Sequence, residues 1–129
     1  MQIYSQKDVN KKALQGARIA ILGYGSQGRA HALNLKDSGF DVVVGVRKTG
    51  ASWAKAKKDG LQVAEPAEAV KGAALVAMLV PDLSQADLYK DVIGGIDKGA
   101  TLLFASQAGK HITGQVLPID GGVSAIIAA

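Results

Sequence analysis

The sequence contains no cysteine, which excludes disulfide bonds and thiolate chemistry. Aromatic residues make up only 5% of its 129 residues, so the core must be built mainly from Ala, Val, Ile and Leu. No apolar run reaches the roughly 18 residues that a membrane-spanning helix needs, and no signal peptide is apparent. We therefore expect a cytoplasmic protein that does not bind membranes.

The sequence also has only a small excess of positive charge. It contains 15 Lys and Arg residues and 11 Asp and Glu residues, which gives a net charge of +4. This excess can help to attract an anionic ligand. Nucleic-acid-binding domains usually cluster basic residues with aromatic ones. This sequence has no such cluster, since the pair Lys57 and Lys58 is typical of a solvated helix face, and we expect no nucleic acid partner.

What the sequence does contain is an alternation of apolar runs with helix-like segments, at a length typical of one domain. We predict strands at residues 18–22, 41–46, 62–63, 74–80, 101–105 and 115–119. We predict helices at residues 7–14, 27–38, 53–58, 66–71 and from 82 or 84 to about 93, with Ser52, and Asp82 or Ser84, as helix caps. This order predicts an α/β fold: a three-layer, doubly wound parallel sheet of about six strands in a single domain, residues 1–129.

A glycine-rich loop, Gly23-Tyr24-Gly25-Ser26-Gln27-Gly28, lies between the first predicted strand and the next helix. In that context Gly23 permits a tight turn, Gly25 lets the main chain approach a pyrophosphate, and Gly28 allows close packing of the helix. The N–H groups at the beginning of the helix favour a phosphate. The loop therefore predicts a Rossmann-type dinucleotide site, although the same spacing can also form a turn without a ligand.

The second predicted strand ends at Arg47, which is followed by Lys48 and, four residues later, Ser52. NAD sites usually carry Asp or Glu at this position to accept hydrogen bonds from the ribose. A guanidinium group can instead bind a 2′-phosphate in a bidentate manner. These residues predict a preference for NADP over NAD, or else they are ordinary residues of a solvated loop.

A third segment, Leu79-Val-Pro81-Asp82-Leu-Ser-Gln85, follows the fourth predicted strand. Ligands of doubly wound sheets lie at the carboxyl ends of the strands. Leu79, Pro81, Asp82 and Gln85 are therefore candidates for contact with the nicotinamide half, with helix capping as the alternative role of Asp82.

Residues 1 to about 105 resemble the N-terminal domain of ketol-acid reductoisomerase. The likeness rests on Ile19 to Gly28, Ala30 to Gly39, Val42 to Arg47, Ala51 to Ala54 and Leu79 to Asp82. The resemblance implies NADPH binding through Tyr24 to Gln27, Arg47, Ser52 and the segment from Asp82 to Gln85. Gly50 departs from the family, which often has a phosphate-binding serine there, so the affinity for the 2′-phosphate is expected to be lower unless Thr49 compensates.

The tail, Ser106 to Gly122, is similar to the closing segment of short-chain dehydrogenases, although their Tyr-x-x-x-Lys motif is absent. We therefore expect a chimera in which residues 106–129 supply a final strand that covers the edge of the fifth. A natural truncated homologue is the alternative.

The family's chemistry requires two magnesium ions, which its members hold in an all-helical domain that this sequence does not include. The carboxylates of Asp82, Asp87, Asp91, Asp97 and Asp120 form no pattern typical of a two-metal site. His31 and His111 match no catalytic motif, and we assign no catalytic residue. We expect a monomer or weak homodimer that binds NADP(H), and NAD less tightly, without a complete active site. A minimal reductase and a designed folding scaffold with a vestigial site are the alternatives.

Overall fold

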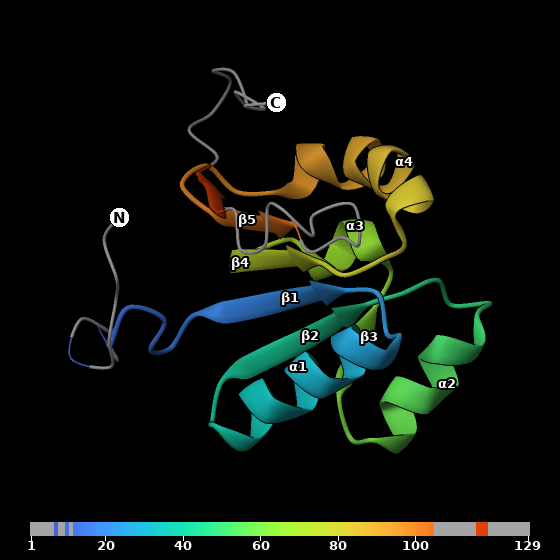
Figure 1. Cartoon of the computed structure of the whole chain (residues 1–129), viewed down its shortest axis with the longest axis horizontal. Coiled ribbons are helices and arrows are strands. Elements are labelled where there is room, and N and C mark those ends of the chain that lie inside the picture. The colour runs from blue at the N-terminus through green and yellow to red at the C-terminus, as the bar shows by residue number, and fades with distance from the viewer. Residues whose placement is uncertain (1–6, 8–9, 11, 105–115, 119–129) are drawn as a thin grey trace.

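The structure is a computed structural model that describes residues 7, 10, 12–104 and 116–118. Helices and strands alternate as the sequence predicts (Figure 1). The elements are β1 (Arg18–Leu22), α1 (Ser26–Asp37), β2 (Asp41–Gly45), α2 (Ala51–Lys58), β3 (Gln62–Ala64), α3 (Pro66–Ala69), β4 (Ala73–Met78), α4 (Asp82–Val92), the 3-10 helix η2 (Ile93–Gly95), β5 (Thr101–Phe104) and β6 (Val116–Pro118).

The six strands form one sheet in the order β3-β2-β1-β4-β5-β6. The chain builds outward from β1 to β3 and then returns to place β4 on the other side of β1. Both neighbours of β1 are parallel to it, with Leu22 opposite Gly45 of β2 and Met78 of β4. The predicted doubly wound Rossmann fold is therefore confirmed, and its switch point lies between β1 and β4.

The sixth strand differs from the expectation of an all-parallel sheet. It pairs with β5 and covers its edge as predicted, but it runs antiparallel, with Thr101 opposite Pro118 and Leu103 opposite Val116. A parallel neighbour requires a crossover of about a dozen or more residues, usually with a helix. Eleven residues separate β5 from β6, and antiparallel pairing does not require such a crossover.

Two predicted helix caps were wrong. Helix α2 begins at Ala51 with Gly50 as its N-cap, so Ser52 is the second helical residue. The reason is a turn in which Gly50 N donates to Arg47 O at 3.0 Å, after which the helix begins at once. Helix α4 begins at Asp82 with Pro81 as its N-cap, so Asp82 is the first helical residue and Ser84 the third.

The leading helix predicted at residues 7–14 is described only in part, with Lys7 in a 3-10 helix and no α-helix at residues 12–14. Residues 12–16 form turns, in which Ala13 N donates to Asn10 O and Gln15 N to Lys12 O. Part of that prediction, and the tail beyond residue 118, lies outside the described residues.

Two apolar cores lie on opposite faces of the sheet, with α1 and α2 over one face and α3 and α4 over the other (Figure 1). Alternate residues of β1 serve the two cores: Ile19 and Ile21 face α1, whereas Ala20 and Leu22 face α3 and α4. Small residues keep the layers close. A Cβ atom at Gly45, for example, would lie 3.0 Å from Ala69 Cβ of α3. The same packing fixes the strand ends that carry the candidate site.

Candidate dinucleotide-binding site

The three segments singled out in the sequence meet at one edge of the sheet. Residues 23–28, 47–52 and 79–85 follow β1, β2 and β4, which are adjacent and parallel. Main-chain hydrogen bonds join the segments where the strands end: Gly23 N donates to Gly45 O at 3.1 Å, and Leu79 N donates to Leu22 O at 2.8 Å. All the predicted cofactor-binding positions therefore lie at the carboxyl ends of the three central strands.

Gly23 forms the turn that leaves β1. Its φ of +102° lies in a region that L side chains rarely adopt. A Cβ atom there would also lie 2.8 Å from Leu79 O and 2.9 Å from Val80 Cγ1. Conformation and close approach to the segment after β4 therefore both require glycine at this position.

Gly25 and Gly28 differ in what surrounds them. A Cβ atom at Gly25, the N-cap of α1, would meet no protein atom within 4 Å, so this side of the loop is open. A Cβ atom at Gly28 would collide with Gly23 O. The close packing predicted for Gly28 is therefore present, whereas Gly25 leaves space that a ligand can fill.

The beginning of α1 faces the same open side. Ser26 and Gln27 are exposed, the first turn contains no acidic residue, and no side chain caps the helix. Uncapped N–H groups and the helix dipole favour an anion at such a position. The geometry suits a phosphate group.

Tyr24 points away from this open side. Its side chain is only 3% exposed, and its hydroxyl group donates a hydrogen bond to Asp59 Oδ2 at 2.8 Å. Burial, followed by the hydrogen bond and the charge of Asp59, raises the pKa of Tyr24 to about 12. Tyr24 therefore offers a ligand its main chain and not its phenol.

Asp59, the C-cap residue of α2, was not singled out in the sequence. Arg29 of α1 binds it in a bidentate manner, with Nε 2.8 Å from Oδ2 and Nη2 3.2 Å from Oδ1. The hydrogen bond from Arg29, and then that from Tyr24, lowers the pKa of Asp59 to about 2. The nearest sequence signal is an acid before Gly60 at the end of a predicted helix, and it does not identify either partner.

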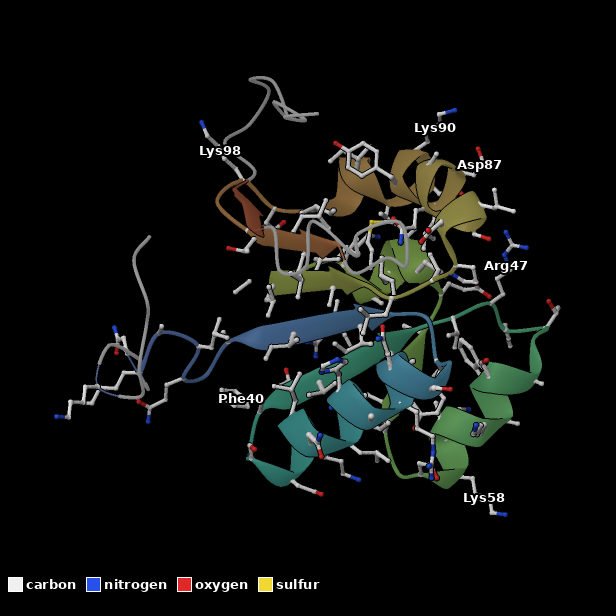
Figure 2. All side chains as sticks on the ribbon, viewed as in Figure 1. Phe40, Arg47, Lys58, Asp87, Lys90 and Lys98 are labelled. Atoms are coloured by element: carbon white, nitrogen blue, oxygen red, sulfur yellow. The ribbon has the colours of Figure 1, made fainter. Side chains whose placement is uncertain are left out.

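The segment after β2 presents its cations to solvent. Arg47 and Lys48 are exposed, and Figure 2 shows the Arg47 side chain extending outward beyond the end of β2. Within residues 12–104, no ion pair includes either of them. Lys48 N donates to Glu65 Oε1 at 2.8 Å, so a carboxylate from the end of β3 holds the main chain of this loop. Glu65 was also missed in the sequence.

The segment after β4 completes the edge. Asp82 is exposed in the first turn of α4, and Leu79 is half-buried. Gln85 Nε2 donates to Val80 O at 3.1 Å, which fastens the turn to the helix. The amide of Gln85 is thus already used in part to shape this segment.

One open hollow lies away from these three segments. It has a volume of about 260 Å³ and lies between residues 72–74 and 97–100, where β4 and β5 begin, at the opposite end of the strands from the glycine loop.

In the part of the chain that the structure describes, no three His, Cys, Asp or Glu side chains are grouped to hold a metal ion. None of the described helices is long and apolar enough to cross a membrane.

Comparison with solved structures supports the fold and the family. An NADH-preferring ketol-acid reductoisomerase from an uncultured archaeon is 36% identical, with a TM-score of 0.74 over 81% of this chain and 33% of its own. A putative F420-dependent NADP reductase from an Arthrobacter species is 25% identical, with a TM-score of 0.62 over 78% of this chain and 50% of its own. A 3-hydroxyisobutyrate dehydrogenase from Mycobacterium tuberculosis, 24% identical with a TM-score of 0.60 over 70% of this chain and 31% of its own, shares the fold.

The chain therefore spans about a third of the length of the reductoisomerase that it matches. A family model described as "Acetohydroxy acid isomeroreductase, NADPH-binding domain" matches residues 13–129. That match includes the stretch similar to short-chain dehydrogenases, and the two-parent origin stays a prediction. The chain belongs to the family of acetohydroxy acid isomeroreductase NADPH-binding domains, the enzymes also called ketol-acid reductoisomerases.

Proposed function

We propose that this chain binds a nicotinamide dinucleotide at the carboxyl edge of its sheet, with NADP(H) preferred to NAD(H). The observation that carries the proposal is the pair of exposed cations, Arg47 and Lys48, beside a glycine loop whose open side begins at Gly25. The pyrophosphate binds at the beginning of α1, and the 2′-phosphate binds at the segment after β2.

The charges after β2 support the preference for a 2′-phosphate. The strand is followed by Val46 and then by Arg47. No carboxylate therefore lies in the position that usually binds the ribose of NAD. The nearby carboxylate of Glu65 accepts a main-chain hydrogen bond and is not paired with either cation. Ser52, in the first turn of α2, adds a hydroxyl group close to the beginning of that helix.

The nicotinamide half extends toward the segment after β4. This segment lies beside the glycine loop, since Gly23 and Leu79 are in close contact. Asp82 and Gln85 then supply polar groups at the first turns of α4. The bound cofactor supplies hydride transfer, and these residues orient its reactive ring.

NAD(H) is the second candidate ligand. It is favoured by the likeness to a reductoisomerase that is itself described as NADH-preferring, at 36% identity. Gly50 also favours NAD(H), because it lacks the hydroxyl group with which the serine often found there in the family binds the 2′-phosphate. Titration with both cofactors separates the two candidates.

The test is calorimetric titration of the wild-type chain and an Arg47→Asp variant with NADPH and NADH. We expect tighter binding of NADPH and at least a roughly ten-fold loss in the variant, because hydrogen bonds to charged groups contribute about 1.5–3 kcal/mol. The matched control is Lys98→Asp, the same change of charge at the opposite end of the sheet (Figure 2), which should leave both affinities unchanged. No binding of either cofactor at millimolar concentration would refute the proposal.

We further propose that the chain, as a monomer or weak homodimer of the cytoplasm, binds cofactor without turning over substrate. The reductoisomerase reaction requires bound magnesium, and the described residues bring no three His, Cys, Asp or Glu side chains together that could hold a metal ion. NADPH absorbance at 340 nm should stay constant with a ketoacid and magnesium. A folding scaffold with a vestigial site would instead show no thermal shift with NADPH, whereas ligand at about 100 times its Kd stabilises a binding protein by about 2.7 kcal/mol.

A further inference from the structure

Three side chains from separate elements meet behind the glycine loop. Asp59 at the end of α2 accepts hydrogen bonds from Tyr24 of the loop and from Arg29 of α1, at 2.8 Å each from Oδ2, with a second contact from Arg29 to Oδ1. Lys36 of α1 adds a hydrogen bond to Gly60 O at 2.9 Å. The end of α2 is therefore fastened to both the loop and α1 by polar contacts.

The other end of α2 carries the proposed 2′-phosphate site. Gly50, two residues after Lys48, is the N-cap, and Ser52 lies in the first turn of the helix. A helix of eight residues is about 12 Å long and does not bend easily. Fixing one end of α2 against the glycine loop thus fixes the distance between its other end and that loop.

The contacts at Asp59 are well suited to hold a position. The ring of Tyr24 is buried in the core that α1 and α2 cover, and the Asp59 side chain is 19% exposed. Bidentate pairing of a guanidinium with a carboxylate restricts the relative orientation of the two groups. The pairing also directs the guanidinium group of Arg29 toward Asp59. The carboxylate of Asp59 therefore neutralises the positive charge of Arg29.

We propose that Asp59 is a positioning residue that couples the two phosphate subsites, because it holds α2 at a set distance from the glycine loop. This proposal rests on the proposed function. A dinucleotide with a 2′-phosphate bridges both subsites, and it gains affinity from the second contact only if the spacing is already correct. A nucleotide with one phosphate does not depend on that spacing.

The test compares three adenine nucleotides by calorimetry: adenosine 2′,5′-bisphosphate, which carries a phosphate for each subsite, and the 2′- and 5′-monophosphates. The variant combines Arg29→Gln with Asp59→Asn, which removes the ion pair and leaves the net charge unchanged. Tyr24→Phe is a second variant that keeps the buried ring and removes only the hydroxyl group. The matched control combines Arg18→Gln with Asp41→Asn, an ion pair of 3.1 Å where β1 and β2 begin, at the opposite edge of the sheet.

We expect the bisphosphate to bind about 5- to 10-fold more weakly to the double variant, and about 2- to 3-fold more weakly to Tyr24→Phe, with less than about a 2-fold change for either monophosphate. The control should bind all three nucleotides as the wild-type chain does. An equal loss for all three nucleotides, or no loss for the bisphosphate, would overturn the positioning role. A wild-type chain that binds none of the nucleotides would instead refute the proposed function, and this inference with it.

Discussion

The hydroxyl group of Tyr24 donates a hydrogen bond to Asp59 across 35 residues of sequence, at 2.8 Å. It turns the one aromatic side chain of the glycine loop inward and joins the loop to the end of α2. Tyr24 is thus one of the two buried residues of the motif, at 3% exposure. The loop is therefore joined by its side chain to a residue outside the motif.

Asp59 should make stability depend on pH in acid. Its pKa in the folded chain is about 2, below the ordinary value of 3.8, so the folded state favours the charged form. The stabilisation is complete above about pH 4 and is lost as the pH falls toward about 2. Urea unfolding at pH 6 and pH 3 should show a smaller difference between wild type and Asp59→Asn at pH 3. An unchanged difference would contradict the lowered pKa.

Tyr24 should ionise only at strongly alkaline pH. Its pKa is raised to about 12 from the ordinary value of 10.0, because burial and Asp59 both disfavour the phenolate. The stabilisation from its neutral form is complete below about pH 10 and is lost as the pH rises through about 12. A titration followed at 295 nm should show an ionisation step near pH 12 that is lost in Tyr24→Phe. The variant Tyr89→Phe is the control, and it should keep that step.

Two alanine substitutions in the glycine loop should have opposite consequences. Gly28→Ala places a methyl group against Gly23 O and should lower the free energy of unfolding by about 1–3 kcal/mol. Gly25→Ala meets no protein atom within 4 Å, and its φ of −78° suits any residue, so stability should change by less than about 0.5 kcal/mol. NADPH binding should nevertheless fall in Gly25→Ala. Wild-type affinity in that variant would place the pyrophosphate elsewhere.

Gly50→Ser should strengthen NADPH binding. Gly50 has the extended N-cap conformation that serine favours, and its Cβ atom would lie 3.3 Å from Arg47 O, a tight contact that needs only a small adjustment. The new hydroxyl group can cap α2, worth a few tenths of a kcal/mol relative to glycine, and can donate to the 2′-phosphate. Gly50→Ala is the control because it adds the Cβ atom without the hydroxyl group. Equal NADPH affinities in the two variants would exclude that contact.

Glu65→Gln should raise the affinity for NADPH about two-fold and leave that for NADH unchanged. Glutamine keeps an oxygen that can accept the hydrogen bond from Lys48 N, but it removes a negative charge near the proposed 2′-phosphate site. The matched control is Glu68→Gln, on the same helix, whose carboxylate contacts Lys71. A similar gain in affinity for both cofactors would mean that Glu65 acts through the conformation of the loop after β2 and not through its charge.

The sequence by itself determined the order of the elements, because apolar runs and helix-like segments differ in period and length. It also located the glycine loop, in which Gly23 and Gly28 meet local geometric needs, and the basic residues that follow β2. Strand boundaries fell within two residues of those observed.

Only the tertiary structure decided the rest. The inward turn of Tyr24, its pairing with Asp59 and Arg29, and the contact from Lys48 to Glu65 all join residues 17 to 35 positions apart. Such contacts depend on which helix ends and strand ends become neighbours, and no local pattern encodes that. The antiparallel direction of β6 and the N-caps at Gly50 and Pro81 were likewise evident only in the three-dimensional structure. Periodicity identifies each element and its buried face, whereas the partners of polar side chains are set by packing between elements distant in the chain.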